Sequence, residues 1–387
     1  MASAGAGVRA PVAPLFSFPF VLNPEPTLAW LRAQDPVHTL PGTELVVLTR
    51  YADCAAALNH PDLSAAGGQE ERSRASGAPP SMLNRDGGDH ARLRRPGSAL
   101  LGPAAVRRTD PARRAAIGAI LDGLGERADL GTEIARPIAT AALAGVLGIL
   151  DVTRFGELAA GVEPALDPTP SPQVAQRGQE GVARLHAFAE PLLLAAEPGS
   201  PLHALANDPE ITRADALGII SLATIGGWGP LAELTTVVVH HLLTLPNWST
   251  TAGDPQWREA FVEDATRWHT PIPFVARRAL VDVQVPSGVV PAGRQVLIHI
   301  GSADRDPERF EEPTAVLPQR ERLREHLAYG GGPHFCLGAA LIRATVPAVI
   351  ELLAERFPAA RLRAATLVWQ PQVFPRRPFS STVELAG

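Results

Sequence analysis

A glycine-rich loop that presents one cysteine is the part of the sequence best suited to chemistry. It runs from Tyr329 to Gly338 as YGGGPHFCLG, and an apolar, helix-forming run from Ala339 to Leu353 follows. A thiolate at the start of a helix lies near the positive end of the helix dipole and near unpaired backbone N–H groups, which favour ionised sulfur. Glycines let the backbone pass close to a flat ligand. The pattern therefore favours Cys336 as a ligand of haem iron, although a lone cysteine is more commonly a small buried hydrophobe.

The whole ten-residue loop resembles the haem-thiolate loop of the cytochrome P450 family, F-G-x-G-x-H-x-C-x-G, with Tyr329 in place of the usual phenylalanine. The resemblance implies haem b as cofactor and Cys336 as the axial ligand of its iron. It extends in order over nearly the whole chain. It therefore implies one domain, 1–387, with the family's fold: mainly α with small β-sheets, in the shape of a triangular prism.

Four basic side chains match the positions where the family contacts the haem propionates. His90 and Arg94 stand four residues apart, so they share one face of a helix, and Arg277 and His334 match two further contacts. Arg278 competes with Arg277 for its role. Because buried carboxylates need charged or hydrogen-bonding partners, such a group of donors suits the two propionates. For His90 and Arg94 alone, a solvated basic face is the alternative.

The segment around Asp264 occupies the place of the family's E-x-x-R motif, which braces the cysteine loop. Here the register gives Asp264 where glutamate is usual, with Arg267 as an i, i+3 partner and Arg320 as the third member. Glu263 is an alternative partner of Arg267 at i, i+4. An ordinary surface ion pair is the remaining alternative.

The long helix above the haem departs most from the family pattern of a small-residue pair followed by an acid and an alcohol. The expected helix ends near Pro246, and the family's usual spacing from there assigns the small pair to Gly226-Gly227, the acid position to Gly229 and the alcohol position to Pro230. Glu233 lies about one turn further along and does not fit the acid position. Both the proton-relaying acid and the alcohol are therefore expected to be missing. Proline cannot donate to the carbonyl four residues back and opens the helix.

Composition describes a globular protein, with 45% hydrophobic and 19% charged residues. The net charge of −5 gives no indication of nucleic acid or an anionic membrane as partner. All 35 basic residues are arginine. Cys54 and Cys336 make no disulfide framework, and residues 1–20 resemble neither a signal peptide nor a membrane anchor. We therefore expect a cytoplasmic protein.

Residues 1–25 are expected to be irregular, as are the loop Ser64–Asp89 and the proline-rich stretch Glu163–Gln173. The expected substrate-recognition surfaces are the loop Ser64–Asp89, the stretch Glu163–Gln173 with the helix that follows it, residues 226–230 and Pro271–Val275. Regular structure is expected elsewhere: helices at Thr27–Ala33, Tyr51–Leu58, from His90, Thr132–Leu150, Gly181–Leu194, Ala214–Leu245 with an interruption at 226–230, and Phe261–His269, and strands at Glu44–Thr49, Val281–Val290 and Gln295–Ile300.

The first hypothesis is a haem-thiolate oxidase or monooxygenase acting on a small or medium biosynthetic intermediate, with electrons from a ferredoxin and ferredoxin reductase. The missing acid–alcohol pair implies atypical oxygen activation. One alternative is an auxiliary protein that keeps the fold, lacks haem catalysis and stabilises a partner such as a glycosyltransferase. Another is a peroxide-using enzyme, because Pro230 resembles the fatty-acid peroxygenase branch. That branch carries arginine before the proline, where this chain has Gly229.

Overall fold

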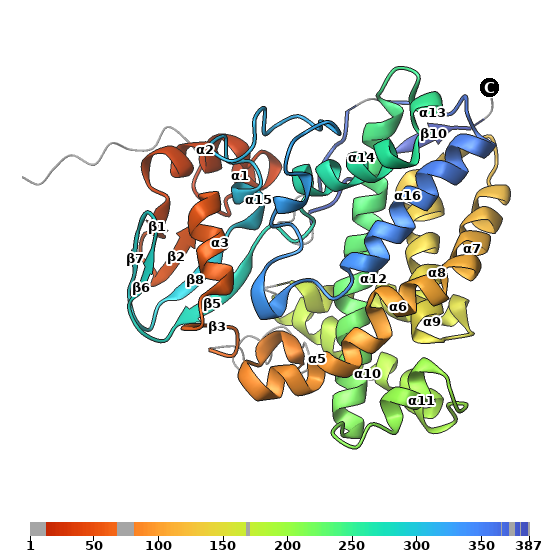
Figure 1. Cartoon of the computed structure of the whole chain (residues 1–387), viewed down its shortest axis with the longest axis horizontal. Helices are drawn as coiled ribbons and strands as arrows, with labels where there is room; N and C mark the ends of the chain where they lie inside the picture. The colour runs from red at the N-terminus through yellow and green to blue at the C-terminus, as the bar shows by residue number, and fades with distance from the viewer. Residues whose placement is uncertain are drawn as a thin grey trace, which may run out of the picture.

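The structure is a computed structural model that describes residues 13–67, 81–167, 171–364, 366–370, 376–379 and 381–385. Most of this part of the chain is helical, and the strands gather mainly at one side, on the left in Figure 1. The predicted fold class, mainly α with small β-sheets, is confirmed. The α-helices are α1 (Phe18–Leu22), α2 (Glu25–Gln34), α3 (Tyr51–Asn59), α5 (Gly87–Leu101), α6 (Pro103–Arg108), α7 (Asp110–Asp122), α8 (Arg136–Leu147), α9 (Val152–Val162), α10 (Pro172–Leu194), α11 (Pro201–Ala206), α12 (Arg213–Leu243), α13 (Trp248–Thr251), α14 (Pro255–Trp268), α15 (Ile300–Ala303) and α16 (Ala339–Arg356).

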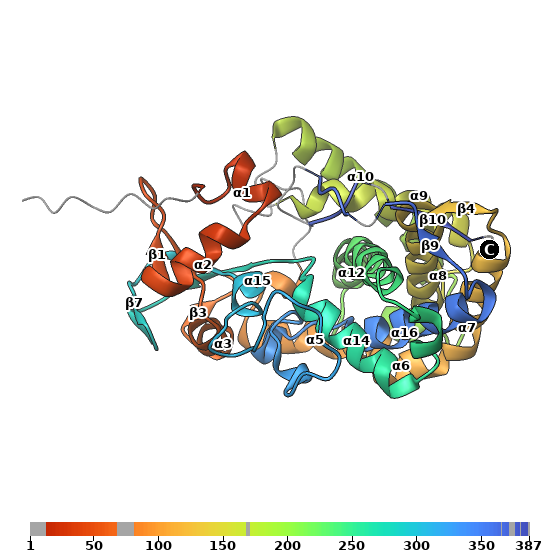
Figure 2. The same ribbon diagram turned by 90° about the horizontal axis from the view of Figure 1, so that it is seen from above.

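Helix α12 lies at the centre of the helical part, with α10 on one side and α14 and α16 on the other (Figure 2). Its N-terminus is fixed by a capping box between Thr212 and Asp215. Two helical segments, Leu130–Leu147 and Arg213–Leu243, are long and apolar enough to cross a membrane by length and composition. However, 61% and 78% of their most apolar windows are buried inside the protein, as expected of core helices.

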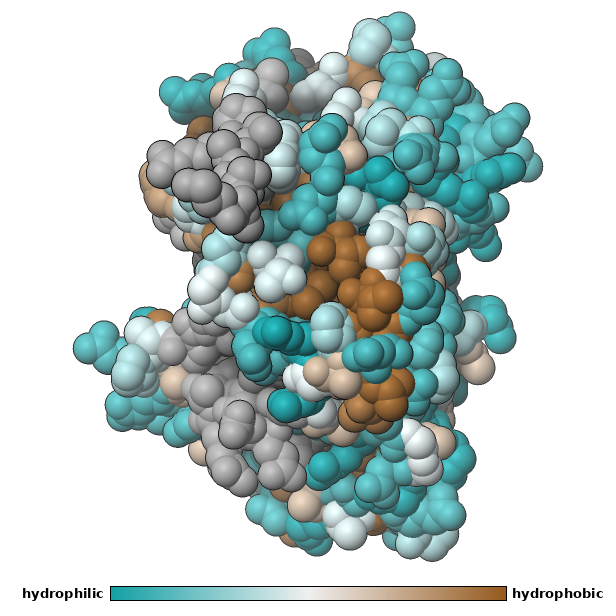
Figure 3. All heavy atoms as spheres, turned by 90° about the vertical axis from the view of Figure 1, so that its left-hand side faces the viewer, coloured by the Kyte–Doolittle hydropathy of each residue, from teal (hydrophilic) through white to brown (hydrophobic). Residues whose placement is uncertain are grey.

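The largest sheet has the strand order β1-β2-β8-β5-β3. Strands β2 and β8 run parallel, and the other neighbours are antiparallel. A second sheet has the order β4-β10-β9, and β6 and β7 form a hairpin. From the side that carries the large sheet, the surface is mostly hydrophilic, with a hydrophobic area near its middle (Figure 3). The strands are β1 (Val37–Thr39), β2 (Leu45–Leu48), β3 (Leu63–Ser64), β4 (Arg127–Asp129), β5 (Val275–Ala279), β6 (Val283–Val285), β7 (Gly288–Val290), β8 (Gln295–Ile298), β9 (Arg361–Leu362) and β10 (Thr382–Glu384).

Several predicted boundaries are wrong for identifiable reasons. The expected interruption of the long helix at 226–230 does not occur, since α12 is continuous through Pro230. Helix α10 begins at Pro172 instead of Gly181, because proline is well tolerated in the first helical turn and the Ser171 hydroxyl accepts a hydrogen bond from the backbone N–H of Val174. The predicted strand Val281–Val290 is the β6–β7 hairpin.

The segments expected to be irregular also contain short regular elements. Helix α1 lies within 1–25, of which the described part begins at residue 13. The expected loop Ser64–Asp89 contains a 3₁₀ turn, η1 (Met82–Asn84), and the start of α5. Its residues 68–80, and residues 168–170 of the proline-rich stretch, lie outside the described residues. A second 3₁₀ turn, η3 (Glu163–Leu166), follows α9 directly.

Replacing Gly181 by alanine is expected to destabilise the protein by about 2 kcal/mol or more, because helices α9 and α10 touch there through backbone atoms. A Cβ on Gly181 would lie 2.2 Å from the carbonyl oxygen of Gly161. Gly145→Ala is the matched control: a Cβ there meets nothing within 4 Å, and alanine favours the helix. Urea unfolding of both variants measures the difference. Equal stability of the two variants would contradict this packing.

Candidate functional site

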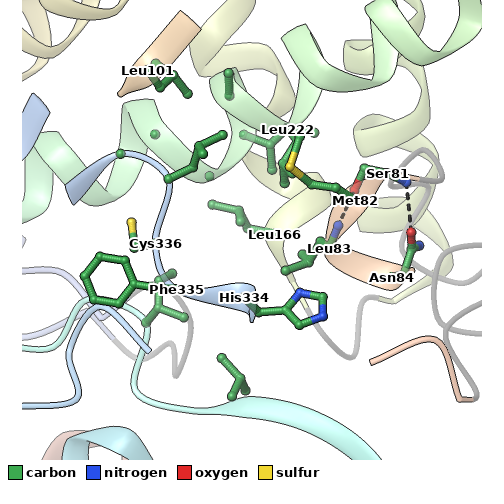
Figure 4. A pocket seen from close by; sticks show the side chains of 18 of the residues that line it. Ser81, Met82, Leu83, Asn84, Leu101, Leu166, Leu222, His334, Phe335 and Cys336 are labelled. Atoms are coloured by element: carbon green, nitrogen blue, oxygen red, sulfur yellow. Dashed lines mark hydrogen bonds between the residues drawn. The ribbon is translucent and has the colours of Figure 1, made fainter. Parts of the chain in front are cut away.

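A pocket of about 390 Å³ lies between α12, the cysteine loop, η1 and strand β5. This volume is in the usual range for a small-molecule site. Figure 4 shows Cys336, Phe335 and His334 following one another along the loop on one side, and Met82 and Leu222 on the other. The lining is predominantly apolar, and its charged and histidine side chains are His90, Arg94, Asp167, Arg277 and His334.

The cysteine loop is held in place by its backbone. The N–H of Cys336 donates to the carbonyl of Tyr329 at 2.7 Å. Gly330 and Gly332 have positive φ angles of 71° and 60°, and a Cβ on Gly332 would lie 2.7 Å from the carbonyl oxygen of Leu58. Glycine is thus required at Gly332 both by conformation and by space. Cys336 precedes α16 by three residues, as the sequence predicts.

The environment of the Cys336 sulfur has opposing effects on its ionisation. Burial raises the pKa of the thiol, and this is the largest effect. Hydrogen bonds from the backbone N–H groups of Gly338 and Ala339 lower it, as does the positive charge of Arg94. The net pKa is raised in the protein alone. Burial therefore outweighs the surrounding donors, which only reduce its effect on the sulfur.

The structure brings together the four basic residues that the sequence assigned to one carboxylate-binding group. His90, Arg94, Arg277 and His334 all line the pocket. The imidazole rings of His90 and His334 have centroids 4.3 Å apart. Burial, together with the charges of Arg277 and His90, lowers the pKa of His334 to about 4. Burial and Arg94 likewise lower the pKa of His90. The positive charge of this group is therefore carried mainly by Arg94 and Arg277.

Local structure decides which arginines point to the pocket. On α5, Arg94 lines the pocket, whereas Arg92 and Arg95 form ion pairs with Asp215 and Asp208, at 2.8 Å each. On β5, side chains alternate between faces, so Arg277 is buried and Arg278 is exposed. Of the two neighbouring arginines, Arg277 therefore lines the pocket and Arg278 does not.

The Asp264 network is buried and is not a surface ion pair. Asp264 Oδ1 accepts from Arg267 Nε at 2.6 Å and from Arg320 Nε at 2.9 Å. Its Oδ2 accepts from the backbone N–H of Leu317 at 2.6 Å. Asp264 and Arg267 have fully buried side chains. Arg267 also donates to the carbonyl oxygens of Asp304, Pro313 and Ala315, so the network holds the segment before the cysteine loop.

Glu263 does not pair with Arg267, so the alternative i, i+4 assignment is wrong. Its carboxylate instead contacts His326, at 3.1 Å, and Arg343 of α16, with Nε at 3.0 Å. Burial raises the pKa of Glu263, but His326 and Arg343 outweigh burial and lower it to about 2. The Arg343 guanidinium lies 4.6 Å from the centre of the Tyr329 ring. No sequence pattern predicts this contact, because Glu263 and Arg343 are 80 residues apart.

On α12, the small pair Gly226 and Gly227 lines the pocket. Gly229 and Pro230 are buried in the same helix but are not among the lining residues. Pro230 has no N–H, so it cannot donate to the carbonyl of Gly226. Trp228 faces the protein interior, since its Nε1 donates to Thr140 Oγ1 at 2.8 Å.

One family model, curated relatives and solved structures are similar to this chain. The family model described as Cytochrome P450 matches residues 258–360, which contain the Asp264 network and the cysteine loop. Nocardicin C N-oxygenase of Nocardia uniformis subsp. tsuyamanensis is 32% identical over 375 residues, with 90% of this chain and 91% of that protein covered. Protein AknT of Streptomyces galilaeus is 31% identical, covering 74% and 68%. The crystal structure of Mycobacterium smegmatis CYP164A2 without ligand superposes with a TM-score of 0.85 at 26% identity, covering 95% and 98%.

Substitution of Asp264 by glutamate, the residue usual in the family motif, is expected to destabilise this protein. The extra methylene has no space in a fully buried site, at a cost of about 1–3 kcal/mol. Asp264→Asn is expected to cost more, about 3–5 kcal/mol, because it leaves two buried guanidinium groups without their counter-charge. Glu259→Gln, on an exposed face of the same helix, serves as the control and is expected to leave stability unchanged. Denaturant unfolding measures all three, and a glutamate variant more stable than the wild type would contradict the geometry.

Proposed function

Since this chain belongs to the cytochrome P450 family and is an oxidoreductase of that type, we propose that it is a monooxygenase of biosynthetic metabolism with Cys336 as the axial ligand of haem iron. The observation that carries the proposal is the placement of the Cys336 sulfur and four carboxylate-binding side chains around one apolar pocket. When bound, haem b supplies the iron at which molecular oxygen is activated for transfer to a substrate.

The residues present fit a group with two carboxylates. His90 Nε2 is buried and has no hydrogen-bonding partner among the described residues. A buried orphaned donor or acceptor is costly, so a ligand group near it is favoured. In the proposal, His90, Arg94, Arg277 and His334 hold the propionates. Asp264, Arg267 and Arg320 act indirectly, by keeping the segment before the cysteine loop rigid.

The proposed substrate is a small or medium apolar intermediate with few polar groups. The wall opposite the cysteine loop is rich in aliphatic side chains, including Met82, Leu166, Ile219 and Leu222. Asp167 is the acidic residue of the described lining, so it is the candidate partner of a substrate amine or hydroxyl group. Nocardicin C N-oxygenase, by its name, oxygenates a nitrogen atom, and the same class of reaction suits an apolar substrate that presents one amine.

In the proposal, oxygen activation differs from the family pattern because Gly229 and Pro230 supply neither an acid nor an alcohol. The carbonyl of Gly226 lacks the N–H that an ordinary residue at Pro230 would donate, so it is available to hold a water molecule beside the pocket. A carbonyl accepts hydrogen bonds but supplies no proton. The proton must therefore come from water, from the substrate or from an acidic side chain outside the helix.

The proposed electron donors are a ferredoxin and its reductase, and the proposed location is the cytoplasm. Ferredoxin-type proteins are acidic partners, and every basic residue of this chain is arginine, which binds carboxylates through two parallel hydrogen bonds. The relatives from Nocardia uniformis and Streptomyces galilaeus are bacterial proteins.

The reduced, CO-treated protein is expected to show the Soret band typical of a thiolate-ligated haem, and Cys336→Ser is expected to abolish it. Serine is a poor iron ligand at neutral pH, since its hydroxyl stays protonated. Cys54→Ser is the matched control, because Cys54 is buried away from the pocket and hydrogen-bonds to the carbonyl of Leu48. A thiolate-type band that persists in Cys336→Ser would refute the proposed ligand.

Removal of the Arg277 side chain is expected to lower the fraction of protein that retains haem several-fold, because one of the carboxylate partners is lost. The neighbouring Arg278→Leu is expected to retain haem like the wild type, since this side chain is exposed on the other face of β5. The ratio of haem to protein absorbance after gel filtration measures both variants. Equal haem retention by Arg277→Leu and Arg278→Leu would remove Arg277 from the proposed set.

A further inference from the structure

A cluster of buried charges lies beside the part of α12 where the acid and the alcohol are missing. Glu233 lies one helical turn after Gly229, with 7% of its side chain exposed. Two guanidinium groups flank its carboxylate at 3.9 Å: Arg136 from α8 and Arg377 from the C-terminal segment. Both contacts are at the outer limit of an ion pair. The two guanidinium groups therefore offset only part of the free-energy cost of burying the Glu233 carboxylate.

A second carboxylate approaches Gly229 itself. Glu163, the first residue of η3, is bonded to Arg377. A Cβ on Gly229 would lie 3.6 Å from Glu163 Oε1. An acid from another element therefore lies beside Gly229, where α12 has no acid of its own.

This cluster adjoins the pocket. Leu222, Gly226, Gly229 and Glu233 follow one another at spacings of three and four residues, so they form one stripe along α12. Leu222 and Gly226 line the pocket. On the opposite side, Ala165 and Leu166 of η3 also line it, two and three residues after Glu163.

Glu233 also borders a second, much smaller cavity, away from the pocket. This cavity of about 30 Å³ is lined by Asp129, Thr132, Arg136, Glu233 and Thr236, together with apolar residues such as Pro378 and Phe379. A cavity of this size has room for about one or two water molecules, and the polar side chains offer them hydrogen-bonding partners. Glu233 is therefore placed between a site suited to water and the stripe that leads to the pocket.

We propose that Glu163 and Glu233, bridged by Arg377, form the proton relay of this protein in place of the acid missing at Gly229. A carboxyl group of the pair gives its proton to a water molecule beside Gly229, and the resulting carboxylate regains a proton from water in the small cavity. Each cycle therefore leaves the number of protons on the two carboxyl groups unchanged. This inference rests on the proposed oxidative function for its purpose, but the shared proton itself does not.

The charges around the pair support proton exchange near neutral pH. Burial raises the pKa of Glu233 to about 7, and the negative charge of Glu163 acts in the same direction. Arg377 and Arg136 lower the pKa but do not outweigh burial. Asp129, which lines the same small cavity, is the further acidic group on this side. Glu233 therefore exchanges its proton near neutral pH, which suits a group that both donates and accepts protons.

Infrared difference spectroscopy of the haem-loaded protein tests for the proton directly. The wild type is expected to show a protonated carboxyl band that disappears as pH rises through about 7. Glu233→Gln is expected to remove the band, and Glu163→Gln to shift its midpoint to lower pH because a neighbouring negative charge is lost. Glu190→Gln, in an exposed pair with Arg213, is the control and leaves the band unchanged. Absence of a band titrating between about pH 6 and 8 in the wild type overturns the proposal.

The fraction of reducing equivalents released as peroxide tests the purpose of the relay. Glu163→Gln and Glu233→Gln are each expected to raise this fraction several-fold, and Glu233→Asp to restore it partly. Unchanged peroxide release in both glutamine variants overturns the relay. If the wild type binds no haem and oxidises no substrate, the proposed function fails, and the same infrared titration of the haem-free protein still decides whether Glu233 carries a proton near neutral pH.

Discussion

The position of the reactive sulfur depends on two adjacent acids of helix α14. Asp264 and Glu263 follow each other in sequence, so their side chains leave the helix in directions about 100° apart. Asp264 binds Arg267 and Arg320 and thereby holds the irregular segment that precedes the cysteine loop. Glu263 binds His326 at the entrance of that loop and Arg343 on the helix that follows it. The loop is therefore anchored at both ends to one helix.

This arrangement explains why a motif that departs from the family pattern still forms. An aspartate at i, i+3 reaches Arg267 with both oxygens, and its second oxygen also accepts from the backbone N–H of Leu317. The pair is fully buried, and such a pair is stable only when its remaining hydrogen-bonding capacity is used. Arg267 uses its remaining hydrogen-bonding capacity by donating to three backbone carbonyl oxygens. The shorter acid is therefore sufficient, because Arg267, Arg320 and the backbone N–H of Leu317 all lie within its reach.

The features that the sequence predicts correctly are those set by neighbouring residues along the chain. The helical spacing of His90 and Arg94 and the thiol at the start of α16 follow from local geometry, and the structure places these residues around one pocket. The start of α10 is not predicted from the sequence, because proline breaks a helix in its interior, whereas Pro172 stands in the first turn, where proline is tolerated. The contacts of Glu263 with Arg343 and of Glu163 with Arg377 join segments 80 and 214 residues apart, and no pattern in a single sequence reveals them.

The absence of an acid at Gly229 of α12 has a consequence that depends on where the acid beside it comes from. An acid carried by the helix would keep its position whatever occupied the pocket, because α12 is continuous and buried. Glu163 instead belongs to η3, whose Ala165 and Leu166 line the pocket. A substrate that packs against these two residues also fixes the carboxylate beside Gly229. In the proposed relay, proton supply is therefore tied to substrate occupancy, and an empty pocket leaves the carboxylate less well positioned to deliver a proton.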